Sequence, residues 1–320
     1  MNENDPSLAD SPASGSTPSA PLFRGEVVLG LWPIAGVTTV GVTDRDADET
    51  IATAIELGVT TFDTAYSYGL SGESDRYLAR AIHGDTDRFH IVSKVGQRYL
   101  DDGKRVVDSR PETLCADAEE SLRRLGIERF NTLMLHSIDE SVPIERSAEA
   151  LLKLRERGLA ERIGLCNASE AERARFDAVC DCRAIQCPLN LLEQGTLGTV
   201  IADSASQGCD VLVYWTLMKG LLAGKISPDH VFPPGDSRPG YAVFQGERRA
   251  AAHRVVDGLK EIASETGRTV ANLSVSWTLS QAGVTGALVG ARRPEQIREV
   301  AGAGPLEAET LTRINALVAS

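Results

Sequence analysis

The chain has 320 residues, with 45 acidic and 33 basic side chains and a formal net charge of −12. This balance lacks the excess of lysine and arginine that neutralises phosphates, so neither nucleic acid nor an anionic membrane is an expected partner. The six cysteines neither suit a disulfide framework in a chain of this length nor pair into zinc-binding motifs, which favours a reducing, cytoplasmic location.

The N-terminal segment differs in composition from the rest of the chain. Residues 1–22 are mainly Ser, Pro, Ala, Gly, Asn and Asp, with too little apolar content to offset the entropy of ordering. We predict a disordered tail over 1–22. The tail has no signal-peptide pattern. The uncharged stretches 27–43 and 269–291 contain proline and glycine or several polar residues, so neither predicts a membrane span.

Eight short β-rich segments alternate with helical patterns after the tail. The predicted strands are 27–29, 60–63, 90–94, 132–136, 162–166, 184–186, 211–214 and 287–289. Eight alternating units favour an α/β fold that closes into a (β/α)8 TIM barrel, one domain over 23–320 with a C-terminal helical segment. A doubly wound open sheet is the alternative, but no Gly-x-Gly-x-x-Gly motif follows the first strand.

Two of the helices have clear boundary signals. A stripe of apolar residues follows Pro111, and Ser109 and Glu112 fit a capping box at the start of that helix. A second stripe follows Pro143, and Gly158 stands where the C-terminal cap of that helix belongs. Both patterns are typical of amphipathic helices that pack on a sheet.

Ionisable side chains stand where three predicted strands end. Asp63, Lys94 and His136 are at strand ends, and Tyr68 lies in the loop after Asp63. In a barrel these positions converge on one mouth, where catalytic groups are found. Each alone has an ordinary explanation, such as a helix cap, a solvated charge or packing. Together they favour catalysis, because a buried lysine between a carboxylate and a phenol is costly unless it serves a function.

The sequence resembles the aldo-keto reductases in five segments that occur in order. They are Asp-Thr-Ala-x-x-Tyr-Gly at 63–69, Ser-Lys-Val-Gly at 93–96, Leu-His at 135–136, Ile-Gly-x-x-Asn at 163–167 and Gly-Ala-Arg at 290–292. The resemblance covers residues 27 to 303. It implies an NAD(P)-dependent oxidoreductase that interconverts a carbonyl compound and an alcohol, with the cofactor extended across the C-terminal mouth of the barrel.

The resemblance assigns a role to each of the four mouth residues. Tyr68 would be the general acid and base for the substrate oxygen. Its unperturbed pKa of about 10 is too high for easy transfer, so a neighbouring cation is needed. Lys94 would supply that charge, and Asp63 would hold Lys94 by an ion pair. His136 would donate a hydrogen bond to the carbonyl oxygen. No cluster of metal ligands is evident.

The resemblance also implies contacts to an NADP(H) cofactor. Asn167 and Gln186 would bind the nicotinamide carboxamide, Tyr214 would stack on its ring, and Arg292 would bind the adenosine 2′-phosphate. The segment 226–245 looks like the loop that clamps the cofactor. The other implied contacts are Cys166, Leu217, Lys225, Arg238, Gly290, Gln296 and Glu299. Further positive charge from Arg293 and Arg298 favours NADP(H) over NAD(H).

Three positions depart from the family pattern. Cys166 stands where serine is usual, Val300 where asparagine is usual, and Trp215 where a small residue is usual. Cys166→Ser should tighten cofactor binding if the side chain faces the nicotinamide, and lower stability if it packs inward. Trp215 is a candidate for the substrate-binding wall, together with Trp32 and Tyr99.

We therefore expect an NADP(H)-dependent reductase whose partner is a small-molecule carbonyl compound or alcohol. One alternative is a cofactor-binding regulatory subunit of the same fold with little turnover. Another is a barrel lyase or isomerase that uses Lys94 to form a Schiff base. The sequence predicts neither the physiological substrate nor the oligomeric state.

Overall fold

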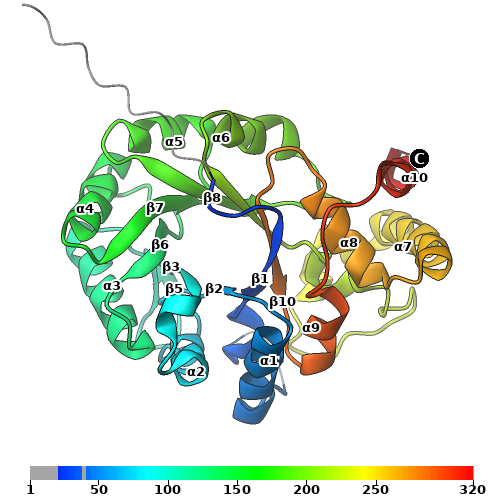
Figure 1. Ribbon diagram of the computed structural model, residues 1–320, viewed down its shortest axis with the longest axis horizontal. Helices are drawn as coiled ribbons and strands as arrows, with labels where there is room; N and C mark the ends of the chain where they lie inside the picture. Colours follow the sequence, from blue (N-terminus) through cyan, green and yellow to red (C-terminus); the bar gives the residue numbers. More distant parts are fainter. Residues whose placement is uncertain (1–20, 38–40, 320) are drawn as a thin grey trace, which may run out of the picture.

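A closed barrel of eight parallel strands is the centre of the computed structural model, which describes residues 21–37 and 41–319 (Figure 1). The strands are β1 (Glu26–Gly30), β2 (Thr61–Asp63), β3 (His90–Val95), β6 (Phe130–Leu135), β7 (Ala160–Cys166), β8 (Cys182–Pro188), β9 (Asp210–Tyr214) and β10 (Gly286–Gly290). Each pairs in parallel with its neighbours around the ring. The predicted TIM barrel is confirmed, and the open sheet is excluded. The predicted tail lies outside the described residues, apart from Pro21 and Leu22.

Helices surround the barrel, as Figure 1 shows. They are α1 (Asp44–Glu56), α2 (Glu73–Ile82), α3 (Pro111–Leu125), α4 (Ile144–Glu156), α5 (Glu170–Asp177), α6 (Ala202–Ser206), α7 (Gly246–Thr266), α8 (Val270–Leu279), α9 (Pro294–Val300) and α10 (Ala308–Ala319). Short 3-10 or π turns lie at Trp32–Ile34, Thr86–Arg88, Leu197–Ile201, Met218–Ala223, Arg238–Gly240 and Ala242–Phe244. None of the helices in the described part of the chain is long and apolar enough to cross a membrane.

The strands are apolar on both faces because they separate two packed layers. In β6, Leu133 and Leu135 belong to the large cluster between the barrel and the helices, whereas Met134 belongs to a smaller cluster. That smaller cluster fills the barrel with residues such as Val28, Leu212 and Leu288, while side chains alternate along each strand. The C-terminal ends of the strands, above this inner cluster, form the floor of the barrel mouth.

The start of α3 differs from the sequence prediction. Arg110 is its N-cap residue, and the buried Ser109 hydroxyl has no hydrogen-bond partner in the described structure. The predicted capping box is therefore wrong. The Asp108 carboxylate instead accepts hydrogen bonds from the Arg110 backbone N–H (3.3 Å) and the Thr113 hydroxyl (3.1 Å). The predicted end of α4 is confirmed, because Gly158 follows it with a left-handed φ of +75°.

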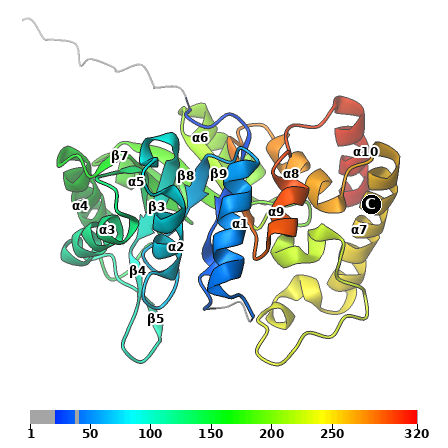
Figure 2. The same ribbon diagram turned by 60° about the horizontal axis from the view of Figure 1, so that its bottom comes forward.

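A short antiparallel hairpin between β3 and α3 was not predicted. It consists of β4 (Gln97–Tyr99) and β5 (Arg105–Val107). Strands of three residues are too short to give a periodic pattern. The hairpin continues from the C-terminal end of β3, and Figure 2 shows it projecting from the same end of the barrel as the 226–245 segment. Both therefore border the mouth.

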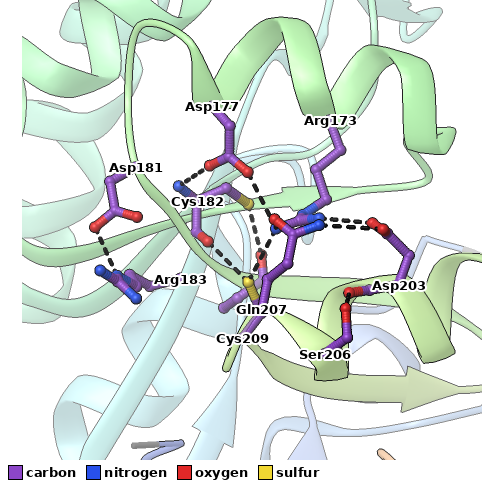
Figure 3. A network of polar contacts seen from close by, with 10 residues as sticks. Arg173, Asp177, Asp181, Cys182, Arg183, Asp203, Ser206, Gln207 and Cys209 are labelled. Atoms are coloured by element: carbon purple, nitrogen blue, oxygen red, sulfur yellow. Dashed lines mark hydrogen bonds and ion pairs between the residues drawn. The ribbon is translucent and has the colours of Figure 1, made fainter. Parts of the chain in front are cut away.

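The opposite end of the barrel is held by a buried arginine (Figure 3). Arg173 of α5 is 2% exposed. Its guanidinium contacts Asp203 (2.7 Å), Asp177 (3.0 Å), the Gln207 side-chain oxygen (2.7 Å) and the Cys209 sulfur (3.4 Å). These contacts join α5 and α6 to the start of β9. The cluster lies at the N-terminal ends of the strands, the face of such barrels that serves stability.

Candidate active site

Two of the predicted mouth residues, Asp63 and Tyr68, contact the Lys94 ammonium directly. Lys94 Nζ donates hydrogen bonds to Asp63 Oδ1 (2.6 Å), the Thr64 carbonyl oxygen (3.0 Å) and Tyr68 Oη (3.1 Å). The Lys94 and Asp63 side chains are 0% and 1% exposed. All three ammonium protons therefore have an acceptor in a site shielded from water.

Strand register and a tight loop produce this arrangement. Asp63 is the last residue of β2 and pairs with Val92 of β3. Lys94 is two residues further along β3, so it lies on the same face as Val92 and closer to the mouth. Tyr68 is held in the following loop, where its carbonyl oxygen accepts a hydrogen bond from the Ser74 hydroxyl (3.0 Å). Gly69 has φ +103°, and a Cβ there would collide with Glu73. The loop therefore requires glycine beside the phenol.

Burial and the ion pair set the protonation states of this group. Burial raises the pKa of the Tyr68 phenol, and the positive charge of Lys94 opposes that rise. For Lys94, burial disfavours the charged ammonium and so lowers the pKa. The attraction to Asp63 and the contact with Tyr68 together outweigh burial, so the Lys94 pKa is raised. The amine thus stays protonated, which disfavours the Schiff-base alternative because a nucleophilic lysine must be neutral.

His136 follows β6 and lies beside the phenol. The two ring centres are 5.8 Å apart. Burial lowers the His136 pKa well below its usual value, and the charges of Lys94 and Arg105 act in the same direction. A neutral imidazole keeps one N–H donor, so His136 can donate a hydrogen bond to a carbonyl oxygen.

A second set of polar side chains adjoins the mouth. Gln186 Nε2 donates to Asp63 Oδ2 (2.8 Å). Tyr214 Oη donates to Asn167 Oδ1 (2.6 Å), and Asn167 Nδ2 donates to the His136 carbonyl oxygen (3.3 Å). Asn167 has a left-handed φ of +58°, a conformation that asparagine tolerates. The residues expected to meet a nicotinamide therefore lie together, and the Gln186 contact to Asp63 is an addition that the sequence did not indicate.

A groove of about 390 Å³ lies along β10 and the segment after β9. Nine of the predicted cofactor or substrate residues line it: Trp32, Trp215, Leu217, Lys225, Arg238, Gly290, Arg292, Gln296 and Glu299. It connects to the mouth at Trp32, whose ring centre is 5.2 Å from that of Tyr68. Tyr99, by contrast, lies in the hairpin and does not line this groove.

The cations of the groove differ in how they are paired. Lys225 forms an ion pair with Glu299, and Arg238 pairs with Asp236 (2.6 Å). The Arg292 guanidinium has no salt bridge with any residue in 21–37 or 41–319. Its pKa is lowered by burial and by neighbouring positive charge. A half-buried, uncompensated guanidinium fits a phosphate group.

The groove as a whole fits an extended dinucleotide. Aromatic and apolar side chains stand near the mouth, and the free guanidinium stands at the start of α9. The Arg292 backbone N–H donates to Gln296 Oε1 (2.8 Å), which fixes this turn. Arg293, the neighbouring cation, points to Asp46 of α1 (2.7 Å).

Two positions that depart from the family pattern are packed in the core. Cys166 is 1% exposed, and its sulfur lies 3.5 Å from that of Met134 inside the barrel. Burial raises the pKa of this thiol to about 12. Val300 is fully buried in the outer cluster. This geometry matches the inward-packing alternative for Cys166.

Similarity to known proteins places the chain in a family. The model of the aldo/keto reductase family matches residues 26–319, so the chain belongs to that family. It is 31% identical over 272 residues to aldo-keto reductase YhdN of Bacillus subtilis, covering 84% of this chain and 82% of that protein. It is also 28% identical over 292 residues to the NADH-specific methylglyoxal reductase of Escherichia coli, covering 85% and 87%.

Solved structures agree. The glycerol dehydrogenase AKR11B4 from Gluconobacter oxydans superposes with a TM-score of 0.85 at 31% identity, covering 92% of this chain and 91% of that one. The protein is thus an oxidoreductase of the aldo-keto reductase class, a class that acts on carbonyl substrates with NAD(P)H.

Replacing Cys166 tests whether its side chain contributes to stability or to cofactor binding. We expect Cys166→Ser to lower the melting temperature and leave NADPH affinity unchanged or weaker, because a hydroxyl in the apolar barrel interior lacks a partner and costs about 1 to 3 kcal/mol. Thermal unfolding and NADPH titration of both forms measure this. Tighter NADPH binding with unchanged stability would show that the side chain faces the cofactor.

Proposed function

We propose that the protein reduces a small carbonyl compound with NADPH and oxidises the alcohol with NADP⁺, with Tyr68 as general acid and base. One observation carries this proposal: the Tyr68 hydroxyl is 3.1 Å from the buried Lys94 ammonium, at the end of a groove that also holds the uncompensated Arg292. Family membership supports the reaction class, and the assignment of residues and of NADP(H) is our own.

Residues of the chain would donate and accept the proton of the substrate oxygen. A bound nicotinamide dinucleotide would supply the hydride for the carbonyl carbon. Tyr68 donates its phenolic proton to the carbonyl oxygen as negative charge develops there. Lys94 stabilises the resulting phenolate, and Asp63 keeps the ammonium charged and fixed. His136 donates a hydrogen bond to the same oxygen. In alcohol oxidation the phenolate takes the proton back.

The other mouth and groove residues would hold the cofactor. Asn167 and Gln186 suit the carboxamide, and Tyr214 suits a stacked ring. Arg292 suits the 2′-phosphate that distinguishes NADPH from NADH. One relative is named as NADH-specific, so membership of the family does not fix the choice between NADPH and NADH. We assign the preference of this chain for NADPH to Arg292, and mutation of Arg292 tests that assignment directly.

Removing the phenolic hydroxyl tests the acid. Tyr68→Phe should bind NADPH nearly as wild type but lose turnover by about 100-fold to 10,000-fold, the usual worth of general acid catalysis. Steady-state reduction of a simple aldehyde measures this. Tyr66→Phe, a change in the same loop, is the matched control: the Tyr66 ring packs on Arg124 of α3 (4.6 Å), so this variant should keep its turnover. A loss under tenfold in Tyr68→Phe would remove Tyr68 from the acid role.

Removing the groove arginine tests cofactor choice. Arg292→Ala should weaken NADPH by roughly 10-fold to 150-fold and NADH much less, since a hydrogen bond to a charged group is worth about 1.5 to 3 kcal/mol. Dissociation constants for both cofactors measure the split. Arg293→Ala, which removes the adjacent guanidinium that pairs with Asp46, should change the ratio little. Equal weakening of both cofactors by Arg292→Ala would contradict the assignment.

A further inference from the structure

The hairpin of β4 and β5 turns one of its faces toward the mouth. Side chains alternate between the faces, and Tyr99 pairs with Arg105 while Gln97 pairs with Val107. Gln97 donates to the Ser137 hydroxyl (2.5 Å), directly after His136. On the opposite face, Arg98 pairs with Asp117 of α3 (3.4 Å). The face that carries Gln97, Tyr99 and Arg105 therefore borders the catalytic residues.

Arg105 reaches the substrate side of the mouth from this face. Its guanidinium carbon lies 5.3 Å from the centre of the Trp32 ring, and that ring is 5.2 Å from the Tyr68 ring. Trp32 thus contacts both the guanidinium and the phenol. The charge of Arg105 also adds to the effect of burial in lowering the pKa of His136. The cation is close enough to act on a molecule bound between Tyr68 and His136.

The charge of Arg105 is not compensated locally. Lys94 is neutralised by Asp63 within the buried pair, and His136 is neutral. Arg105 is exposed and has no carboxylate within salt-bridge distance in the part of the chain that the structure describes. In a chain of net charge −12, this leaves an unpaired positive group on the hairpin side of the mouth, where it can attract an anion.

We propose that Arg105 binds an anionic group, a carboxylate or a phosphate, on the substrate whose carbonyl oxygen lies between Tyr68 and His136. The planar guanidinium can form two parallel hydrogen bonds to either group. Trp32 lies between the cation and the phenol and offers an apolar surface for the carbon chain. The inference rests on the proposed carbonyl reduction and adds a substrate class to it.

The test compares anionic aldehydes with neutral aldehydes of similar size. The carboxylate pair is 4-oxobutanoate and butanal, and the phosphate pair is glyceraldehyde 3-phosphate and glyceraldehyde. For each pair, the ratio of kcat/KM for the anionic aldehyde to kcat/KM for the neutral aldehyde is measured with NADPH. We expect Arg105→Gln to lower this ratio by roughly 10-fold to 100-fold in at least one pair, with partial recovery in Arg105→Lys.

The control removes a neighbouring charge from the same hairpin. Lys104→Ala lies in the turn and should leave both ratios near their wild-type values. A drop confined to one pair identifies carboxylate or phosphate as the group bound. An unchanged ratio in both pairs for Arg105→Gln, with neutral aldehydes still reduced, would overturn this inference alone. Absence of turnover with all four aldehydes in the wild type would overturn the proposed function and, with it, this substrate class.

Discussion

The ion pair between Lys94 and Asp63 is the interaction on which the rest of the site depends. Both side chains are withdrawn from water, and removing one partner of such a pair costs about 3 to 5 kcal/mol because the other is left charged and buried. The other polar atoms of the pair also have partners: Lys94 donates to the Thr64 carbonyl oxygen and to Tyr68, and the second carboxylate oxygen of Asp63 accepts from Gln186. A stable cation is thereby fixed against a phenol.

The barrel turns this local constraint into an active site. Strand register brings Asp63 and Lys94 together from β2 and β3, and parallel closure brings β6, β7, β8 and β9 to the same end. The segments after β3 and β9 then border two sides of the mouth. The segment after β3 is the hairpin with Arg105, and the segment after β9 forms a groove together with Arg292, which follows β10. These two guanidiniums, which have no salt bridge within residues 21–37 and 41–319, lie at different sides of the mouth, so the proposed cofactor and substrate contacts would be separate.

The sequence predicted the features that depend on pattern and missed those that depend on distant contacts. Eight alternating strands and helices were enough for the barrel, and strand ends were enough for the grouping of Asp63, Lys94 and His136. The capping box failed because Asp108 competes with Ser109 for the start of α3. The pairing of Lys225 with Glu299 joins residues far apart in the chain. No local signal marks such a contact.

The account's central claim is that Asp63 acts through Lys94, as one unit, on the Tyr68 phenol. A double-mutant cycle in kcat for reduction of a neutral aldehyde tests it, with Asp63→Asn, Lys94→Met and the double variant compared with wild type, and with NADPH binding as the check on folding. The account predicts that the double variant loses no more turnover than Lys94→Met alone, because residues that act as a unit are not additive. Losses that multiply in the double variant would contradict it.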